Sequence, residues 1–219
     1  MEKFGVGQSV RREEDPRLLR GRGLFTNDVN LPNQTYAIML RSPHAHAEIR
    51  SIDTAAASSA PGVQGVFTGE NVAADNLGVP GMPAKWKRPD GEPMKYRPQP
   101  PLALGRVRYV GDPVALVVAD TLDQARDAAE LIDVDYQDLP SITNTAKTVD
   151  PDAALVWDDS PDNVSGQFQA GNADAVEAAF ANAARIVKRR FVISRVFAQY
   201  MEPRGAIGDY DEHEDRYTL

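Results

Sequence analysis

The chain has no cysteine among its 219 residues. This absence excludes a disulfide framework and a thiolate-bound iron–sulfur cluster, because both require cysteine from the chain itself. Long hydrophobic runs are also missing: the residues after Met1 do not resemble a signal peptide, and no stretch approaches the length of a membrane span. These absences predict a cytoplasmic protein whose iron–sulfur clusters, where its enzyme uses them, lie on another polypeptide.

The charge is acidic, with 24 Lys and Arg against 32 Asp and Glu and a formal net charge of -8. A basic face is needed to neutralise phosphates, so this balance argues against non-specific binding to nucleic acid or to an anionic membrane. A hydrophobic share of 42% is enough for a core, and the length fits one large domain or two small ones. A hydrolase is disfavoured, since there is no cysteine and no Gly-x-Ser-x-Gly elbow.

Apolar periodicity predicts an α+β fold with short helices. The polar residues 1–34 form an extended N-terminal arm with a turn at 21–23. Strands are expected over 36–40, 47–52, 63–68, 106–110, 114–119 and 134–136, and short helices over 54–60 and 71–75. The continuous apolar run at 114–119 is typical of a strand buried on both faces.

The clearest helix follows that strand. Thr121 is its expected N-cap, and Gln124 comes three residues later, as in a capping box. One apolar face then repeats at helical spacing, through Leu122, Ala125, Ala129 and Ile132.

The remaining residues are expected to form a loop over 137–170, a helix beginning near Asn172 or Asp174 and reaching Phe180, and strands over 186–196, 206–210 and 217–219.

The longest aperiodic stretch, residues 76–101, is rich in proline and glycine. Loops of more than about 12–15 residues in a compact domain are usually functional or disordered. Basic and aromatic residues gather within it, namely Lys85, Trp86, Lys87, Arg88, Lys95, Tyr96 and Arg97. Such a mixture can bind single-stranded nucleic acid, but the overall acidity favours a solvated loop that its aromatics anchor to the protein. A lid or wall against a neighbouring domain is the functional alternative.

His44 and His46 share one face if their segment is extended, so the pair could ligate a metal ion. A site needs three or four ligands, and the only other histidine, His213, is far away in the sequence. The structural interpretation is that both rings bond backbone and carboxylate groups at a turn.

Two glycine-containing segments are candidate anion sites. The turn at 21–23 lacks the third glycine of a dinucleotide fingerprint and follows no buried strand. Gly171 precedes a helix, but Asn172 and Asp174 favour ordinary capping over phosphate binding.

Four phrases, in order along the chain, resemble the large subunit of molybdenum hydroxylases. They are Arg12-Glu13-Glu14-Asp15-Pro16-Arg17-Leu18-Leu19-Arg20-Gly21, Leu40-Arg41-Ser42-Pro43-His44-Ala45-His46-Ala47, Arg108-Tyr109-Val110-Gly111-Asp112-Pro113-Val114-Ala115 and Met201-Glu202-Pro203-Arg204-Gly205. That family includes xanthine dehydrogenase, aldehyde oxidase and molybdenum carbon monoxide dehydrogenase.

The resemblance implies a hammerhead-type mixed sheet followed by the first strands of a molybdopterin-binding domain. It divides the chain into an arm over 1–34, a hammerhead domain over 35–165 and a linker, helix and start of the second domain over 166–219. The complete enzyme would hold molybdopterin and oxidise an aldehyde, an N-heterocycle or carbon monoxide. Its partners would be the rest of the large subunit and subunits that carry iron–sulfur clusters and FAD.

The family's pterin-contacting segments and its general-base glutamate are not found in this sequence. We therefore expect no catalytic, cofactor-binding or metal-binding residue here, and Glu202 receives no catalytic role. The chain is expected to be a scaffold part of the enzyme, either a fragment or a split subunit, and inactive by itself. The alternative is a free-standing, non-catalytic binding domain that reuses the hammerhead scaffold.

Overall fold

A computed structural model describes residues 11–76, 79, 86–97, 99–193, 196, 200, 202 and 204–219. The chain divides into two compact units. One is Thr35–Ile186, and the other combines Met1–Gln34 with Val187–Leu219.

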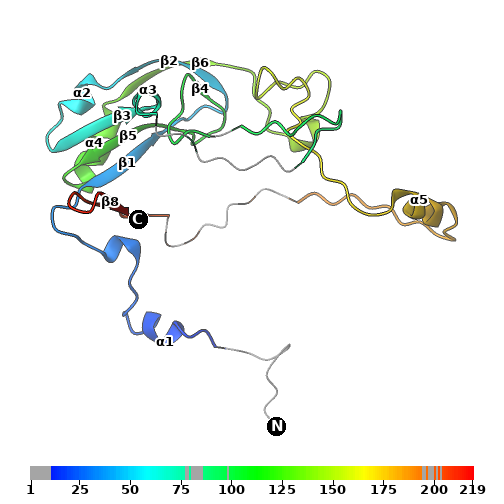
Figure 1. The fold of residues 1–219 in the computed structure, drawn as a ribbon, viewed down its shortest axis with the longest axis horizontal. Helices are drawn as coiled ribbons and strands as arrows, with labels where there is room; N and C mark the ends of the chain where they lie inside the picture. Colours follow the sequence, from blue (N-terminus) through cyan, green and yellow to red (C-terminus); the bar gives the residue numbers. More distant parts are fainter. Residues whose placement is uncertain are drawn as a thin grey trace, which may run out of the picture. The chain divides into compact units, whose positions relative to one another are not determined.

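The larger unit is built around a three-stranded antiparallel sheet in the order β1-β5-β3 (Figure 1). The strands are β1 (Tyr36–Arg41), β5 (Pro113–Ala119) and β3 (Val63–Thr68). The central strand is the apolar run predicted from the sequence, and four of its side chains, Val114, Ala115, Val117 and Ala119, are fully buried. A strand with neighbours on both edges can bury both faces only if its side chains are almost all apolar, so the central position of β5 follows from its composition.

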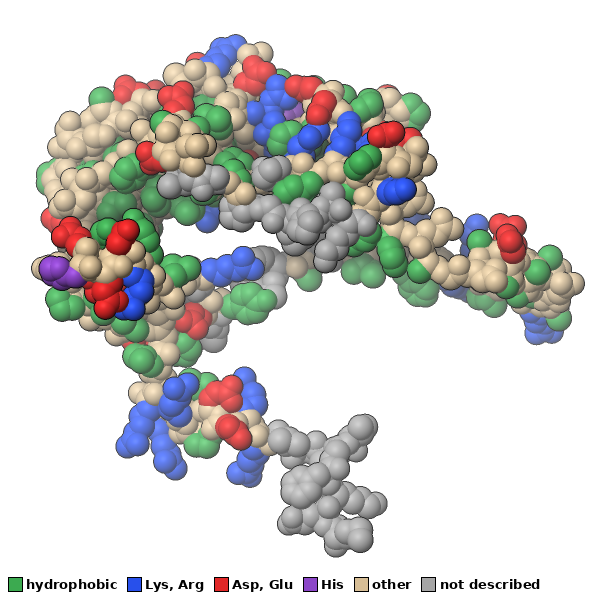
Figure 2. All heavy atoms as spheres, viewed as in Figure 1, with side chains coloured by type: hydrophobic (Ala, Val, Ile, Leu, Met, Phe, Trp, Pro, Cys, Tyr) green, Lys and Arg blue, Asp and Glu red, His purple; other side chains and the backbone are tan. Residues whose placement is uncertain are grey.

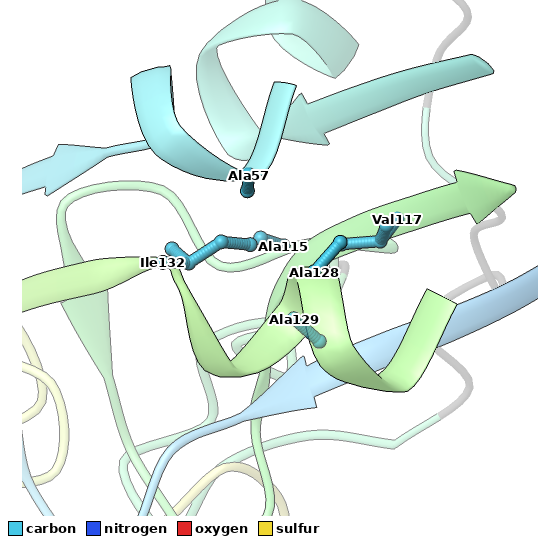
Figure 3. Packing of buried hydrophobic residues seen from close by; sticks show 6 residues of the cluster. All are labelled: Ala57, Ala115, Val117, Ala128, Ala129 and Ile132. Atoms are coloured by element: carbon cyan, nitrogen blue, oxygen red, sulfur yellow. The ribbon is translucent and has the colours of Figure 1, made fainter. Parts of the chain in front are cut away.

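Helix α4 (Leu122–Glu130) covers this sheet, and its predicted start is confirmed. The Thr121 side chain accepts a hydrogen bond from the Gln124 backbone N–H at 3.2 Å. Small side chains let α4 and α2 (Ala55–Ser58) pack closely on strand β5. The buried cluster that they form consists of Ala57, Ala115, Val117, Ala128, Ala129 and Ile132 (Figure 3). Among the described residues, valine is the largest side chain that is fully buried, so the core depends on close backbone approach.

A second antiparallel sheet has the order β4-β2-β6. Its strands are β4 (Arg106–Val107), β2 (Ala47–Asp53) and β6 (Asp133–Asp138). A second buried cluster, Ala47, Ala103, Val107 and Val114, lies against it. Ile52 and Val134 pack against both clusters, so the two sheets share one continuous apolar interior.

Helix α3 (Gly69–Ala74) begins where the backbone comes very close to residues 103–104. A Cβ on Gly69 would lie 2.2 Å from the Ala103 carbonyl oxygen, which no side chain tolerates. The described part of this unit also contains η2 (Thr145–Lys147) and α5 (Ala173–Ala181). Asn172 caps α5 by accepting a hydrogen bond from the Ala175 N–H at 3.0 Å, as the sequence predicts.

In the smaller unit, α1 (Asp15–Leu18) and η1 (Thr26–Asp28) interrupt the N-terminal arm, which is thus less extended than predicted. Strands β7 (Asp209–Asp211) and β8 (Arg216–Thr218) form an antiparallel hairpin. The Tyr210 and Tyr217 rings stack across it, with centroids 4.6 Å apart.

Several element predictions were wrong in extent. The predicted strand over 186–196 is not formed by its described residues, 186–193 and 196, because no neighbouring segment supplies the ladder hydrogen bonds that make a strand. The strand predicted over 106–110 ends at Val107, since the buried Asp112 carboxylate accepts the Arg108 N–H and turns the chain. The strand predicted over 206–210 begins only at Asp209.

The helix predicted over 54–60 is shorter in the structure, where α2 covers Ala55–Ser58. The Thr54 side chain makes no cap bond, and Asp53 accepts the Ala55 N–H at 2.9 Å instead. No helix within the described ranges is long and apolar enough to cross a membrane.

Candidate functional site

Two of the sequence phrases meet in space. The Ser42 N–H donates to the Asp112 carbonyl at 2.9 Å, and the Gly111 N–H donates back to the Ser42 carbonyl at 2.8 Å. Arg41 Nη1 donates to the Gly111 carbonyl at 2.8 Å. Gly111 has φ +93°, a conformation that favours glycine. These contacts therefore hold together the connection from β1 to β2 and the connection from β4 to β5, which run between the two sheets.

The two predicted histidines lie beside this junction and make different contacts. His44 Nδ1 is 2.6 Å from Asp138 Oδ1, and its ring centroid is 4.6 Å from that of Tyr136. His46 is 8% exposed, and its Nδ1 is 2.8 Å from the Pro140 carbonyl oxygen. A carboxylate partner and a backbone partner are the contacts that the structural interpretation predicts.

The His46 ring is only half satisfied. A carbonyl oxygen only accepts hydrogen bonds, so Nδ1 carries the hydrogen. The opposite ring atom, Nε2, is buried and has no hydrogen-bond partner within the described part of the chain. His46 lines two neighbouring cavities of about 30 and 230 Å³, which it shares with Pro140, Ala154 and Leu155.

Two arginines border these cavities, and they are paired very differently. Arg106 donates to Glu48 at 3.0 Å and to Asp158 at 3.0 Å. The hydrogen bond with Asp158 is the largest cause that raises the pKa of Arg106. Arg108 forms no ion pair within 4 Å among the described residues. Burial is the main cause that lowers its pKa and the Arg106 charge adds to the effect, while the charges of Asp112 and Asp158 oppose it.

Trp157 contacts two arginines of this region. Its ring centroid lies 3.6 Å from the guanidinium carbon of Arg108 and 5.4 Å from the guanidinium carbon of Arg97. A guanidinium over an indole face is attracted by the ring quadrupole. Trp157 thereby connects the turn after β4 with the end of the proline-rich loop.

The proline-rich loop is also held by a buried cation. Arg88 is 8% exposed, and its Nη2 donates to Asp162 at 2.7 Å, while Nη1 donates to the Val164 carbonyl. Burial alone would lower the pKa of Arg88, but the hydrogen bonds and charges of Asp162 and Asp90 outweigh it, so the pKa is raised. Arg88 therefore anchors the loop to the segment that follows residue 157.

Two other basic residues of this loop bond to one acidic residue. Lys95 donates to the Asp159 carbonyl, and Arg97 pairs with the Asp159 carboxylate. The Arg97 hydrogen bond is the main cause that lowers the pKa of Asp159. Acidic and basic side chains lie intermixed over the surface in Figure 2. No uniform basic face is thus presented here, which argues against the nucleic-acid interpretation.

The aromatic residues of this loop are less buried than Arg88. Trp86 is 51% exposed, with its ring 6.4 Å from Phe168, whereas Tyr96 is half-buried. Lys87 forms isolated bridges with Pro93 and Gln167. Lys85 falls outside the described residues.

Glu202, Gly21 and Gly171 have roles in the backbone structure. Glu202 Oε1 accepts the Thr26 N–H at 3.2 Å, so this phrase holds the N-terminal arm. Gly21 and Gly171 have φ +66° and +110°, respectively, as turn glycines do.

Local sequence patterns did not indicate the contacts of Trp157, Arg106 and Arg108, or the acidic residues that pair with the loop. A usable signal was present, since the run Asp158-Asp159 with Asp162 complements the basic run in 85–97. Pairing across 62 to 74 residues of chain cannot be read from local periodicity.

Comparison with known proteins identifies the scaffold. Residues 20–140 match the family model described as aldehyde oxidase and xanthine dehydrogenase, a/b hammerhead domain. The chain belongs to the aldehyde oxidase and xanthine dehydrogenase family. Residues 156–219 match the model of the molybdopterin cofactor-binding domain. The resemblance drawn from the four phrases and the α+β hammerhead fold are confirmed.

Relatives of this hammerhead chain are large subunits of oxidoreductases. It is 39% identical over 214 residues to the nicotine 6-hydroxylase large subunit of Paenarthrobacter nicotinovorans, which covers 98% of the chain and 25% of the relative. It is 32% identical over 227 residues to the carbon monoxide dehydrogenase large chain of Afipia carboxidovorans, covering 98% of the chain and 27% of the relative. Among solved structures, quinoline 2-oxidoreductase from Pseudomonas putida 86 superposes with a TM-score of 0.75 at 35% identity, covering 99% of the chain and 26% of that structure.

The hammerhead chain thus spans about a quarter of the length of these relatives. In 187–219, every described residue is exposed except the half-buried Ile207 and Asp211. A pterin cofactor needs an enclosing, water-excluding pocket. The described residues of this segment do not fit that requirement. In the described ranges, no group of three or more His, Asp or Glu side chains is placed to hold a metal ion.

Proposed function

We propose that this chain is the scaffold part of the large subunit of a molybdopterin-dependent oxidoreductase and supplies no catalytic residue. The order of the two matched models carries this proposal: a hammerhead model over 20–140 is followed directly by a molybdopterin-binding model over 156–219. The hammerhead part has a buried core, whereas the second part is almost wholly exposed. Its role is to support the cofactor domain.

The proposed division is an N-terminal arm over 1–34, a hammerhead domain over 35–165, and a linker, helix and start of the cofactor domain over 166–219. The physical support is the contrast in apolar exposure between these parts. Val187, Phe191, Val192, Ile193 and Val196 are each at least 80% exposed. Lys188, Arg189 and Arg190 separate Val187 from the apolar run at 191–193. Exposed apolar side chains gathered in one segment mark an interaction site, because monomeric proteins rarely leave them in water. Its proposed partner is the molybdopterin-binding remainder of the large subunit.

The proposed reaction of the complete enzyme is hydroxylation of an N-heterocycle, with water as the oxygen source. Two of the relatives support this substrate class, since one is named for nicotine and another for quinoline. Oxidation of carbon monoxide is the second candidate reaction, because another relative is a carbon monoxide dehydrogenase large chain. Electrons would leave through iron–sulfur and flavin subunits, because this chain has no cysteine to ligate a cluster.

Docking of the exposed segment is tested by charge insertion. In the tagged chain expressed in its native cells, Val192→Asp should abolish co-purification with the molybdopterin-binding remainder, because a carboxylate cannot be buried unpaired in an apolar interface. Val149→Asp is the matched control, since Val149 is an exposed valine (63%) in the hammerhead unit. The proposal fails if both variants retain the partner equally, or if the unsubstituted chain recovers none.

A further inference from the structure

Helix α5 is an apolar helix that the described part of the chain leaves uncovered. Of its nine residues, only Asp174 and Glu177 are charged, and the other seven are alanine, valine or phenylalanine. Every residue of α5 is exposed, including Val176 (53%) and Phe180 (57%). A helix this rich in apolar side chains is normally buried, because their contact with water is unfavourable.

The hydrogen bonds around α5 are also local. The Asn172 side chain accepts the Ala175 N–H at 3.0 Å, and Asn182 Nδ2 donates to the Ala178 carbonyl at 2.8 Å. Among the described residues, no hydrogen bond or ion pair joins 172–183 to another segment. Isolated helices shorter than about 12–15 residues are marginal in water, and packing of one face stabilises most helices in proteins. The nine residues of α5 therefore need a surface to pack against.

The apolar side chains of α5 form one face. Residues four apart lie above one another on a helix, so Val176 and Phe180 form one row and Ala175 and Ala179 form the row beside it. The two charged residues lie on the opposite side. A ridge of larger side chains beside a groove over two methyl groups is suited to interdigitation with a packed neighbour. We call these four residues the α5 apolar face.

The matched family models indicate what covers this face. Helix α5 lies inside residues 156–219, which match the molybdopterin cofactor-binding domain, and beyond the hammerhead match, which ends at residue 140. The chain spans about a quarter of the length of its relatives. Farther along the chain, the exposed apolar segment that begins at Val187 is already proposed to contact the molybdopterin-binding remainder. The α5 apolar face and that segment thus belong to the same incomplete domain.

We propose that the α5 apolar face packs against an apolar surface of the molybdopterin-binding remainder of the large subunit, as a second contact separate from the segment that begins at Val187. This inference rests on the proposed function, because it takes that remainder as the partner. Asp174 and Glu177 stay in water on the opposite side, so docking buries no unpaired charge. The assembly, rather than the sequence of α5 alone, then stabilises the helix.

Thiol alkylation tests which side of α5 is covered. The chain has no cysteine, so one introduced thiol reports on one position. Ala179→Cys lies on the α5 apolar face, and Glu177→Cys is the matched control on the opposite side. Each variant is purified as the complete enzyme through a tag on this chain and treated with N-ethylmaleimide, and the peptide that contains the substitution is quantified by mass spectrometry.

The alkylation rate of each thiol is divided by its rate in urea, which removes differences in intrinsic reactivity. The ratio for Ala179→Cys should be smaller than that for Glu177→Cys by roughly tenfold or more, because a covered thiol reacts only when the structure opens. Equal ratios in an enzyme that contains the molybdopterin-binding remainder would overturn the inference and leave the proposed function standing. Recovery of the chain without that remainder would overturn both.

A second pair of variants measures the contribution of the contact to stability. Ala179→Lys should lower the thermal unfolding temperature of the complete enzyme, because it brings a charge into an apolar contact. Ala181→Lys is the control, since residue 181 lies on the charged side, four residues after Glu177, at a spacing that favours a Glu–Lys pair. It should leave the unfolding temperature unchanged. Equal unfolding temperatures for the two variants would contradict the proposed contact.

Discussion

Gly69 sets the close approach between α3 and the strand connection at residues 102–104, and Gly69→Ala tests how firmly that approach is held. In an open helical site, replacing glycine by alanine stabilises a helix by up to about 1 kcal/mol. At Gly69, the added Cβ would lie 2.2 Å from the Ala103 carbonyl oxygen and 2.8 Å from the carbonyl carbon. The backbone at residue 69 or residue 103 must therefore move by about 1 Å before the added Cβ and the Ala103 carbonyl oxygen reach an ordinary contact distance.

The movement is expensive because residue 103 is fixed on all sides. Ala103 is 6% exposed and Leu102 is 2% exposed. The Ala103 N–H donates to the Pro113 carbonyl at 2.7 Å. Overpacking of a filled core costs about 1–3 kcal/mol, and strain on that hydrogen bond adds about 1 kcal/mol. These costs exceed the helix gain, so we expect a net loss of about 2 kcal/mol.

Thermal unfolding of the 219-residue chain measures this loss. For a domain of this size, about 2 kcal/mol corresponds to a fall in Tm of roughly 4–8 °C. Gly208→Ala is the control, because a Cβ there meets nothing within 4 Å and its φ is not positive; its Tm should be unchanged or slightly higher. A Gly69→Ala protein with an unchanged or raised Tm would refute the packing described for α3.

Three further outcomes are expected. Thr121→Ala should cost about 1 kcal/mol of unfolding free energy in urea, because the Gln124 N–H loses its 3.2 Å acceptor; an unchanged urea midpoint would contradict the cap. Trp157→Leu should increase protease cleavage within 86–97, since the ring no longer holds the two arginines beside it; cleavage equal to that of the unsubstituted chain would count against the anchor. The hydrogen bond from the Val164 backbone N–H, together with the Arg88 guanidinium, lowers the pKa of Asp162. The ionised Asp162 therefore stabilises the fold above the ordinary Asp pKa of about 4, and this stabilisation is lost as the pH falls through the lowered pKa. Asp162→Asn should therefore flatten the acid dependence of the unfolding midpoint below about pH 4, and a curve parallel to that of the parent chain would refute this.

Local signals predicted the parts of the fold that depend on local physics. The run at 114–119 became the central strand β5, because only an apolar strand can be covered on both faces. Thr121 with Gln124 and Asn172 with Ala175 became helix N-caps, because capping is decided within four residues.

Elements that require a partner were not predictable. Residues 186–196 have an apolar composition suited to a strand, but a strand exists only where a neighbour accepts its hydrogen bonds. The same limit explains the short β4, whose end is decided by Asp112 reaching back to the Arg108 N–H.

The candidate site was predicted only in part. The interpretation that His44 and His46 bond carboxylate and backbone groups agrees with the structure. Their partners are Asp138 and Pro140, each 94 residues away in the sequence. The sequence did not indicate that Trp157 lies against two arginines, or that Nε2 of His46 is buried without a hydrogen-bond partner among the described residues. Those features arise from packing between distant segments, which composition and periodicity do not encode.

The central claim is that this chain works as part of a molybdopterin-dependent enzyme. The most direct test is the molybdenum and pterin content of the assembly purified through a tag on this chain from its native cells, with mass spectrometry of the co-purifying segments. The account predicts molybdenum and pterin in equal amounts to the tagged chain, together with the polypeptide that carries the pterin-binding segments. Recovery of the chain in a defined complex that contains neither molybdenum nor pterin would contradict it.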